Sequence, residues 1–109
     1  MKLWLDDIRP PWKHGYVGWE WVKTADEAIE LLKTGNVTEA SLDHDLSVEA
    51  TLGNPSPHEK TGYTVVCWME ENNVWPSRVN VHSLNPVGRR RMMDVIQKHT
   101  DGNFTLGGI

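Results

Sequence analysis

Short apolar segments alternate with helix-forming segments along this chain, and this alternation constrains the fold more than any other feature of the sequence. Residues 2–5, 19–22, 37–42 and 79–82 have the length and composition of short strands. Strands that alternate with helices favour a parallel sheet with helices packed on it. We therefore predict one α/β domain over residues 1–109, with a mostly parallel sheet of four strands and about three helices.

Three segments carry helix signals. A capping box begins at Thr24, and Gly35 supplies the stop for that helix. The apolar spacing of residues 63–72 predicts a second helix. A third helix is predicted to begin at Asn85-Pro86, which provides an N-cap and a proline at the first helical position.

The remaining segments contain residues that break helices. Prolines and a glycine within residues 8–17 exclude a regular helix there. Residues 46–62 form a loop that is long for a compact domain, and such loops are often lids or binding loops. Residues 104–109 are a candidate for a fifth strand at the sheet edge, although two glycines weaken that signal.

Composition narrows the range of partners. The formal net charge is −4, which gives no general electrostatic reason to bind nucleic acid. Contact with an RNA end is the one nucleic-acid interaction that stays open. No apolar run approaches membrane length, and the acidic residues after Leu5 come too early for a signal peptide. The single cysteine excludes an intrachain disulfide. We expect a cytoplasmic protein without a membrane partner, and the sequence leaves its oligomeric state open.

Polar clusters follow three of the predicted strands at the point where each strand ends. Ligands of open parallel sheets bind beyond the carboxyl ends of the strands. The clusters are therefore predicted to converge into one site. They are Asp6-Asp7, Asp43-His44-Asp45 and His82-Ser83.

Two adjacent carboxylates at the end of a strand have more than one interpretation. Asp6 and Asp7 could hold a divalent cation such as Mg²⁺ or Mn²⁺, or they could anchor an arginine or a general acid. The alternative is a solvated strand end or a cap for the following turn. Arg9 is close enough in sequence to neutralise this pair or to bind a phosphate through its planar guanidinium.

Asp43-His44-Asp45 places three ionisable side chains in succession, which costs free energy unless a function requires it. Strand alternation predicts that Asp43 and Asp45 point to one side and His44 to the other, unless the backbone turns. A carboxylate beside an imidazole raises the imidazole pKa and fixes its tautomer, which suits general acid–base catalysis. The alternative is a capped turn exposed to water.

The last cluster leads directly into a helix. Ser83, Asn85 and the free amides at the helix start are predicted to form an anion-binding corner, and Arg89 follows one turn further along. His58 could reach the site if the loop over residues 46–62 folds across it, and it is otherwise interpreted as a surface residue.

Four motifs emerge when the clusters are read with their flanking residues: LWLDDIRP at 3–10, LDHDL at 42–46, TGY at 61–63 and VHSLNPVG at 81–88. Together they resemble the cyclic-phosphate processing receiver domains, a family similar to the receivers of response regulators. The resemblance spans nearly the whole chain. It implies a small receiver-like (flavodoxin-like) fold that is truncated relative to a full receiver.

The chain differs from an ordinary receiver in several respects. No helix is expected between the first two strands, and the weak final strand carries no lysine at its end. Histidines also stand where a simple phosphoacceptor site needs none. A phosphorylation switch is therefore not expected, although Asp43 matches the phosphoacceptor position of receivers.

The resemblance implies chemistry on a cyclic phosphate. Opening a cyclic phosphodiester needs a nucleophile, a base, an acid for the leaving oxygen and groups that stabilise charge at phosphorus. His44 and His82 could divide the base and acid roles, with Asp43 and Asp45 beside them as catalytic residues. The candidate substrate-binding residues are Arg9, Ser83, Asn85 and Arg89, and the candidate ligands of a divalent cation are Asp6, Asp7 and Asp43.

Three hypotheses remain open at this point. The first is a phosphoesterase that hydrolyses a small cyclic phosphate, such as a cyclic nucleotide or a nucleotide-derived cyclic phosphate. The second is a non-catalytic module that binds a phosphate-containing ligand. The third is a degenerate receiver that binds a partner protein or accepts a phosphoryl group.

Overall fold

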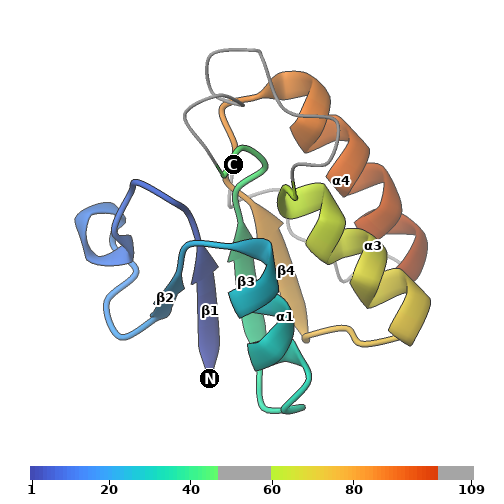
Figure 1. The fold of residues 1–109 in the computed structure, drawn as a ribbon, viewed down its shortest axis with the longest axis horizontal. Helices are drawn as coiled ribbons and strands as arrows, with labels where there is room; N and C mark the ends of the chain where they lie inside the picture. Colours follow the sequence, from blue (N-terminus) through green and yellow to red (C-terminus); the bar gives the residue numbers. More distant parts are fainter. Residues whose placement is uncertain (47–59, 101–109) are drawn as a thin grey trace.

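The computed structural model describes residues 1–46 and 60–100, and it confirms the predicted α/β class. The four strands form one sheet in the order β2-β1-β3-β4, and every pair of neighbours is parallel (Figure 1). The predicted fifth strand and most of the long loop, including His58, lie outside the described residues. The elements are β1 (Lys2–Leu5), the 3₁₀ helix η1 (Pro11–His14), β2 (Glu20–Val22), α1 (Ala25–Leu32), β3 (Glu39–Leu42), α3 (Gly62–Asn72), β4 (Arg78–Val81) and α4 (Pro86–Thr100).

Helix α1 begins and ends where the sequence predicts. The Thr24 hydroxyl accepts a hydrogen bond from the Glu27 amide at 3.1 Å, as an N-cap does. The Glu27 carboxylate accepts in return from the Thr24 hydroxyl at 3.0 Å and from the Lys23 amide at 3.3 Å. Gly35 follows the helix with a φ of 75°, a left-handed conformation that favours glycine.

Helices α1, α3 and α4 form one layer on a single face of the sheet. Helix α3 packs between the other two, α1 also packs on β1, and α4 packs on β4. Alternate strand residues, among them Leu3, Leu5 and Leu42, point into this layer and form the buried core with the helices. Within the described part of the chain, no helix is both long enough and apolar enough to cross a bilayer.

The opposite face of the sheet carries Trp4, Ser41 and Asn80, which are all buried. The segment between β1 and β2 lies at the left of the sheet in Figure 1, and its residues Arg9 and Tyr16 contact Trp4. The Trp4 indole donates a hydrogen bond to the Arg9 carbonyl at 2.7 Å, and its ring lies 4.7 Å from the ring of Tyr16. This connection contains the short η1 in place of an α-helix, in agreement with its prolines.

The parallel register brings the strand ends to the same level. Leu5 pairs with Leu42, and Leu42 pairs with Val81, so each strand stops beside its neighbour. One further hydrogen bond extends each ladder, from the Asp43 amide to the Leu5 carbonyl and from the His82 amide to the Leu42 carbonyl. The residues that follow β1, β3 and β4 therefore share one edge, as the sequence predicts.

Candidate functional site

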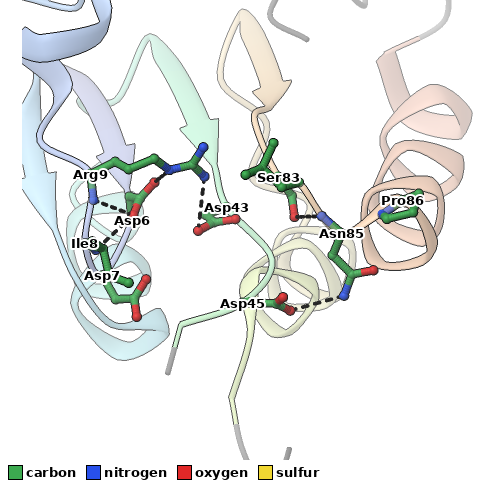
Figure 2. Close-up of a pocket in the computed structure, with 10 residues that line it drawn as sticks. Asp6, Asp7, Ile8, Arg9, Asp43, Asp45, Ser83, Asn85 and Pro86 are labelled. Atoms are coloured by element: carbon green, nitrogen blue, oxygen red, sulfur yellow. Dashed lines mark hydrogen bonds and ion pairs between the residues drawn. The ribbon is translucent and has the colours of Figure 1, made fainter. Parts of the chain in front are cut away.

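A cavity of about 470 Å³ lies at this edge, beyond the carboxyl ends of β1, β3 and β4 (Figure 2). It brings together the predicted acidic pair, both aspartates after β3, and the start of α4. Its lining residues are Asp6, Asp7, Ile8, Arg9, Asp43, Asp45, Ser83, Leu84, Asn85 and Pro86.

Asp6 organises one side of the cavity. Its Oδ1 accepts hydrogen bonds from the amides of Ile8 at 2.9 Å and Arg9 at 2.8 Å. Its Oδ2 accepts from Arg9 Nε at 2.8 Å and lies 3.1 Å from His82 Nε2. Burial alone would raise the pKa of Asp6, but these hydrogen bonds, that of His82 first, lower it to about 2. Asp6 is thus ionised, and its oxygens are already engaged.

Arg9 is the cation of the cavity lining. Its Nη2 lies 3.4 Å from Asp43 Oδ2 and donates to the His82 carbonyl at 3.2 Å, so the guanidinium bridges the ends of three strands. Within residues 1–46 and 60–100, no hydrogen bond involves its Nη1. The side chain is 29% exposed, which leaves part of the guanidinium accessible to a ligand.

Asp43 lies against this arginine with only 7% of its surface exposed. Burial raises its pKa to about 6, and the charge of Asp6 adds to the shift, while Arg9, the His44 amide and the Ser83 hydroxyl oppose it in part. A carboxyl group with this pKa exchanges a proton near neutral pH. Asp43 is therefore suited to acid–base chemistry at the floor of the cavity.

Two further carboxylates make the cavity acidic. Burial raises the pKa of Asp7, and the negative charge of Asp6 adds to the effect. Asp45 Oδ1 lies 2.7 Å from His44 Nδ1 and accepts from Asn85 Nδ2 at 3.2 Å. Four carboxylates thus face one guanidinium in the lining.

His82 lies behind the cavity rather than in its lining. Its ring is stacked on Trp4, with centroids 3.9 Å apart and planes within 3°. Both ring nitrogens are engaged, Nδ1 with Ser41 Oγ at 2.7 Å and Nε2 with Asp6. Burial lowers its pKa more than the hydrogen bond to Asp6 raises it, so the ring is neutral at pH 7. Sequence reasoning did not single out Ser41 or Trp4.

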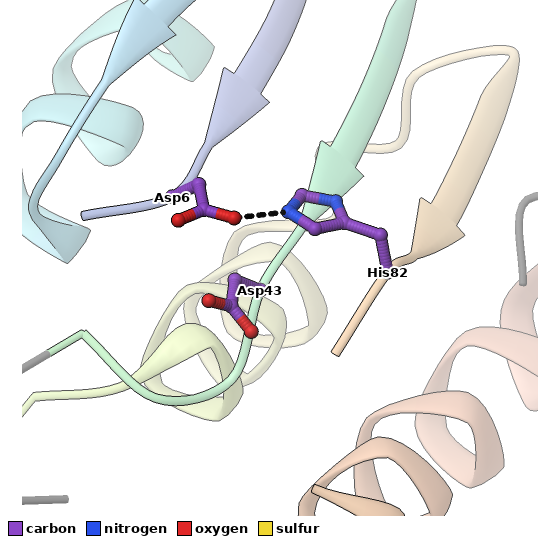
Figure 3. A group of neighbouring side chains, drawn as sticks. All are labelled: Asp6, Asp43 and His82. Atoms are coloured by element: carbon purple, nitrogen blue, oxygen red, sulfur yellow. Dashed lines mark hydrogen bonds and ion pairs between the residues drawn. The ribbon is translucent and has the colours of Figure 1, made fainter. Parts of the chain in front are cut away.

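Asp6, Asp43 and His82 offer metal-ligand atoms within 4.8 Å of one another (Figure 3). Arg9 competes for this position, because its guanidinium already contacts both carboxylates. Asp6 Oδ2, the oxygen that contacts Arg9 Nε, also forms a hydrogen bond with His82 Nε2. A cation at this point would have to displace Arg9, so Asp6 is less accessible to a metal than the sequence suggests.

The alternation predicted for Asp43, His44 and Asp45 is present, since both aspartates line the cavity and His44 does not. The His44 ring packs against Gly88 of α4, where an added Cβ would overlap the ring. His44 therefore contacts Asp45 from outside the cavity and is placed to orient that carboxylate.

The predicted anion-binding corner is only partly available. Asn85 caps α4, because its Oδ1 accepts from the Gly88 amide at 3.0 Å, and its own amide donates to Ser83 Oγ at 3.1 Å. Pro86 has no N–H, so the first turn offers fewer free amides than expected. Arg89 follows on α4 but is not among the residues that line the cavity.

Most of the chain matches the model of one protein family. The family model described as the cyclic-phosphate processing receiver domain matches residues 1–98. The chain belongs to this family. No curated protein and no solved structure matches it.

Packing explains why this cyclic-phosphate processing receiver domain carries Thr61 and Gly62 at the start of α3. The Gly62 amide donates to the His44 carbonyl at 2.9 Å, and Thr61 caps α3 by accepting from the Tyr63 amide. A Cβ on Gly62 would overlap the carbonyl group of Asp43. Glycine is therefore required for α3 to approach the backbone that carries the site.

Proposed function

We propose that this receiver-like domain binds and hydrolyses a small cyclic phosphate, such as a cyclic nucleotide or a nucleotide-derived cyclic phosphate. One observation carries the proposal: Arg9 is held at the cavity by Asp6 and lies beside Asp43, a carboxyl group with a pKa of about 6. A fixed guanidinium binds phosphate oxygens, and a carboxyl group of this kind moves protons.

Hydrolysis of a cyclic phosphodiester requires one bond to form and one to break. The oxygen of water bonds to phosphorus, a ring P–O bond breaks, and the leaving oxygen gains a proton. In this proposal ionised Asp43 accepts the proton of the attacking water, a solvent water protonates the leaving oxygen, and Asp43 then releases its proton to the solvent. Arg9 stabilises the negative charge that develops on the non-bridging oxygens.

The acidity of the cavity bears on whether a divalent cation takes part. Four carboxylates and one guanidinium would repel an anionic phosphate unless further positive charge is present. Asp7 and Asp45 are the carboxylates that would hold Mg²⁺ or Mn²⁺, since Asp6 is fully engaged. When bound, such a cation would neutralise this surplus and polarise a phosphate oxygen.

The two predicted catalytic histidines have supporting positions in this proposal. His82 holds Asp6, and His44 holds Asp45. Neither ring lines the cavity. They therefore orient carboxylates rather than exchange protons with the substrate.

The first test is phosphorus NMR of wild-type protein with a panel of cyclic phosphates, with and without Mg²⁺. We expect conversion to a phosphomonoester, and a loss of affinity of about 10- to 100-fold in Arg9→Ala, because a charge-assisted contact is removed. Arg90→Ala is the matched control, since Arg90 is exposed on α4 and pairs only with Asp94 among the described ion pairs. No conversion by wild type, with intact ligand recovered, would contradict hydrolysis and favour a binding module.

An apolar rim at the mouth of the cavity favours a substrate with an apolar body. Ile8 and Leu84 line the cavity and are 61% and 87% exposed, and exposed Val87 follows close by in sequence. Isolated exposed apolar residues are common, but two in the lining of one cavity can contact a planar base.

We expect Leu84→Ser to weaken binding of a cyclic nucleotide by about 5- to 10-fold, because apolar contact area is lost. Affinity for inorganic phosphate should stay unchanged. Val17→Ser is the control, since Val17 is similarly exposed but lies outside the cavity lining. Calorimetric titration with both ligands measures the difference, and an equal loss for both ligands would argue against a base-binding rim.

A further inference from the structure

A chain of polar contacts runs from the buried face of the sheet to the cavity. Ser41 on β3 is fully buried, and its Oγ lies 2.7 Å from His82 Nδ1. His82 Nε2 lies 3.1 Å from Asp6 Oδ2, and the same oxygen accepts from Arg9 Nε at 2.8 Å. Ser41 is thus linked to the cavity arginine through two intermediates.

The chemistry of each group sets the direction of these hydrogen bonds. Asp6 accepts from two backbone amides and from Arg9, so it is an ionised acceptor. His82 Nε2 must then carry the proton and donate to it. Burial and the nearby guanidinium disfavour a second proton on the ring, which leaves Nδ1 as an acceptor. The hydroxyl of Ser41 therefore donates to Nδ1.

We propose that Ser41 is a positioning residue for Arg9. Its hydroxyl holds Nδ1 of the His82 ring, the Nε2–H on the other side of the ring anchors Asp6, and Asp6 holds the guanidinium at the cavity. Stacking on Trp4 fixes the plane of the His82 ring within this relay of contacts from Ser41 to Arg9. The link to phosphate binding rests on the proposed function, whereas the link to the His82 ring and to Arg9 does not.

The ligand-free test is NMR of protein labelled with ¹⁵N. Wild type should show His82 protonated at Nε2 and an Arg9 Nε–H signal protected from solvent exchange. Ser41→Ala removes the donor to Nδ1, so the ring should be held less firmly against Asp6, and both the His82 Nε2–H and the Arg9 Nε–H should exchange faster with solvent. Unchanged exchange rates at both positions would overturn the proposal.

Asn80→Ala is the matched control for packing. Asn80 pairs with Ser41 in the register, lies on the same buried face, and its Oδ1 has no hydrogen-bond partner among the residues that the structure describes. The control should leave both NMR signals as in wild type. Equal changes in Asn80→Ala and Ser41→Ala would overturn the relay in favour of general packing.

A double-mutant cycle separates the relay from the proposed function. With a 2′,3′-cyclic nucleotide as the probe, Ser41→Ala should weaken binding by about 5-fold. His82→Gln has an amide N–H whether or not Ser41 is present, so Ser41→Ala should cost little further affinity in that background. Wild type that binds no cyclic nucleotide would contradict the proposed function, and the NMR comparison would still decide the role of Ser41.

Discussion

Alanine in place of Gly62 is expected to destabilise the protein by about 3 kcal/mol or more, since the packed core leaves no room for the added methyl group. The new Cβ would overlap the carbonyl group of Asp43, which is backbone and cannot rotate away, and it would lie 2.9 Å from Met92 Cε. Helix α3 would have to move off the strand end. The prediction is checked by urea unfolding followed by circular dichroism.

Gly35→Ala is the matched control for this substitution. A Cβ on Gly35 would meet no atom within 4 Å, so only its positive φ of 75° opposes the change. The expected cost there is about 1 kcal/mol. Equal unfolding midpoints for the two variants would show that the contact between α3 and Asp43 does not require glycine.

Asp43→Asn is expected to stabilise the protein at neutral pH and to slow the proposed hydrolysis of a cyclic phosphate. Asparagine cannot accept the proton of water as a carboxylate does, so the rate of hydrolysis should fall by about 100- to 10,000-fold. The same change removes a buried charge that Asp6 repels. The gain in unfolding free energy at pH 7.5 should be about 3 kcal/mol at most, given a pKa raised from 3.8 to about 6.

The gain in stability of Asp43→Asn depends on pH, and the raised pKa of Asp43 determines in which direction. Because the pKa of Asp43 is higher in the folded protein, the folded state binds more protons between about pH 4 and pH 6. The stabilisation that comes from this extra bound proton is complete at low pH and is lost as the pH rises through about 6. The advantage of Asp43→Asn should therefore be large at pH 7.5 and small at pH 4.

Urea unfolding in metal-free buffer at both pH values measures this difference. Asp94→Asn is the control, since Asp94 is an exposed aspartate on α4 and should show no comparable gain. A less stable Asp43→Asn variant at pH 7.5 would mean that the contacts to Arg9 and Ser83 outweigh the cost of the buried charge. Full hydrolytic activity in that variant would exclude Asp43 as the base.

The gain in stability and the loss of activity expected for Asp43→Asn have the same physical cause. A carboxyl group can keep a pKa near 6 only if its surroundings disfavour its charge, and that cost lowers the stability of the fold. Asp6 shows the opposite balance, because its hydrogen bonds lower its pKa to about 2. Two neighbouring aspartates with separated pKa values are typical of sites that move protons.

Local signals in the sequence were sufficient for the fold class and for the edge that carries the site. Thr24 and Asn85 cap helices because their side-chain oxygens reach amides only three residues away. The period of two along a strand was sufficient to separate Asp43 and Asp45 from His44. Strand ends of a parallel sheet meet at one edge, so the convergence of the polar clusters also followed.

The tertiary structure alone decided which of these residues face the cavity and which support it. His82 contacts Asp6 across 76 positions of sequence and Ser41 across 41, and no local pattern encodes such pairs. The close approach of Gly62 to Asp43 likewise depends on how α3 packs on the sheet. Periodicity specifies the face on which a side chain lies, whereas its partners and its pKa depend on packing between distant segments. The sequence therefore determined where the polar clusters meet, and the packing determined that Arg9 and Asp43 face the cavity while His82 lies behind it.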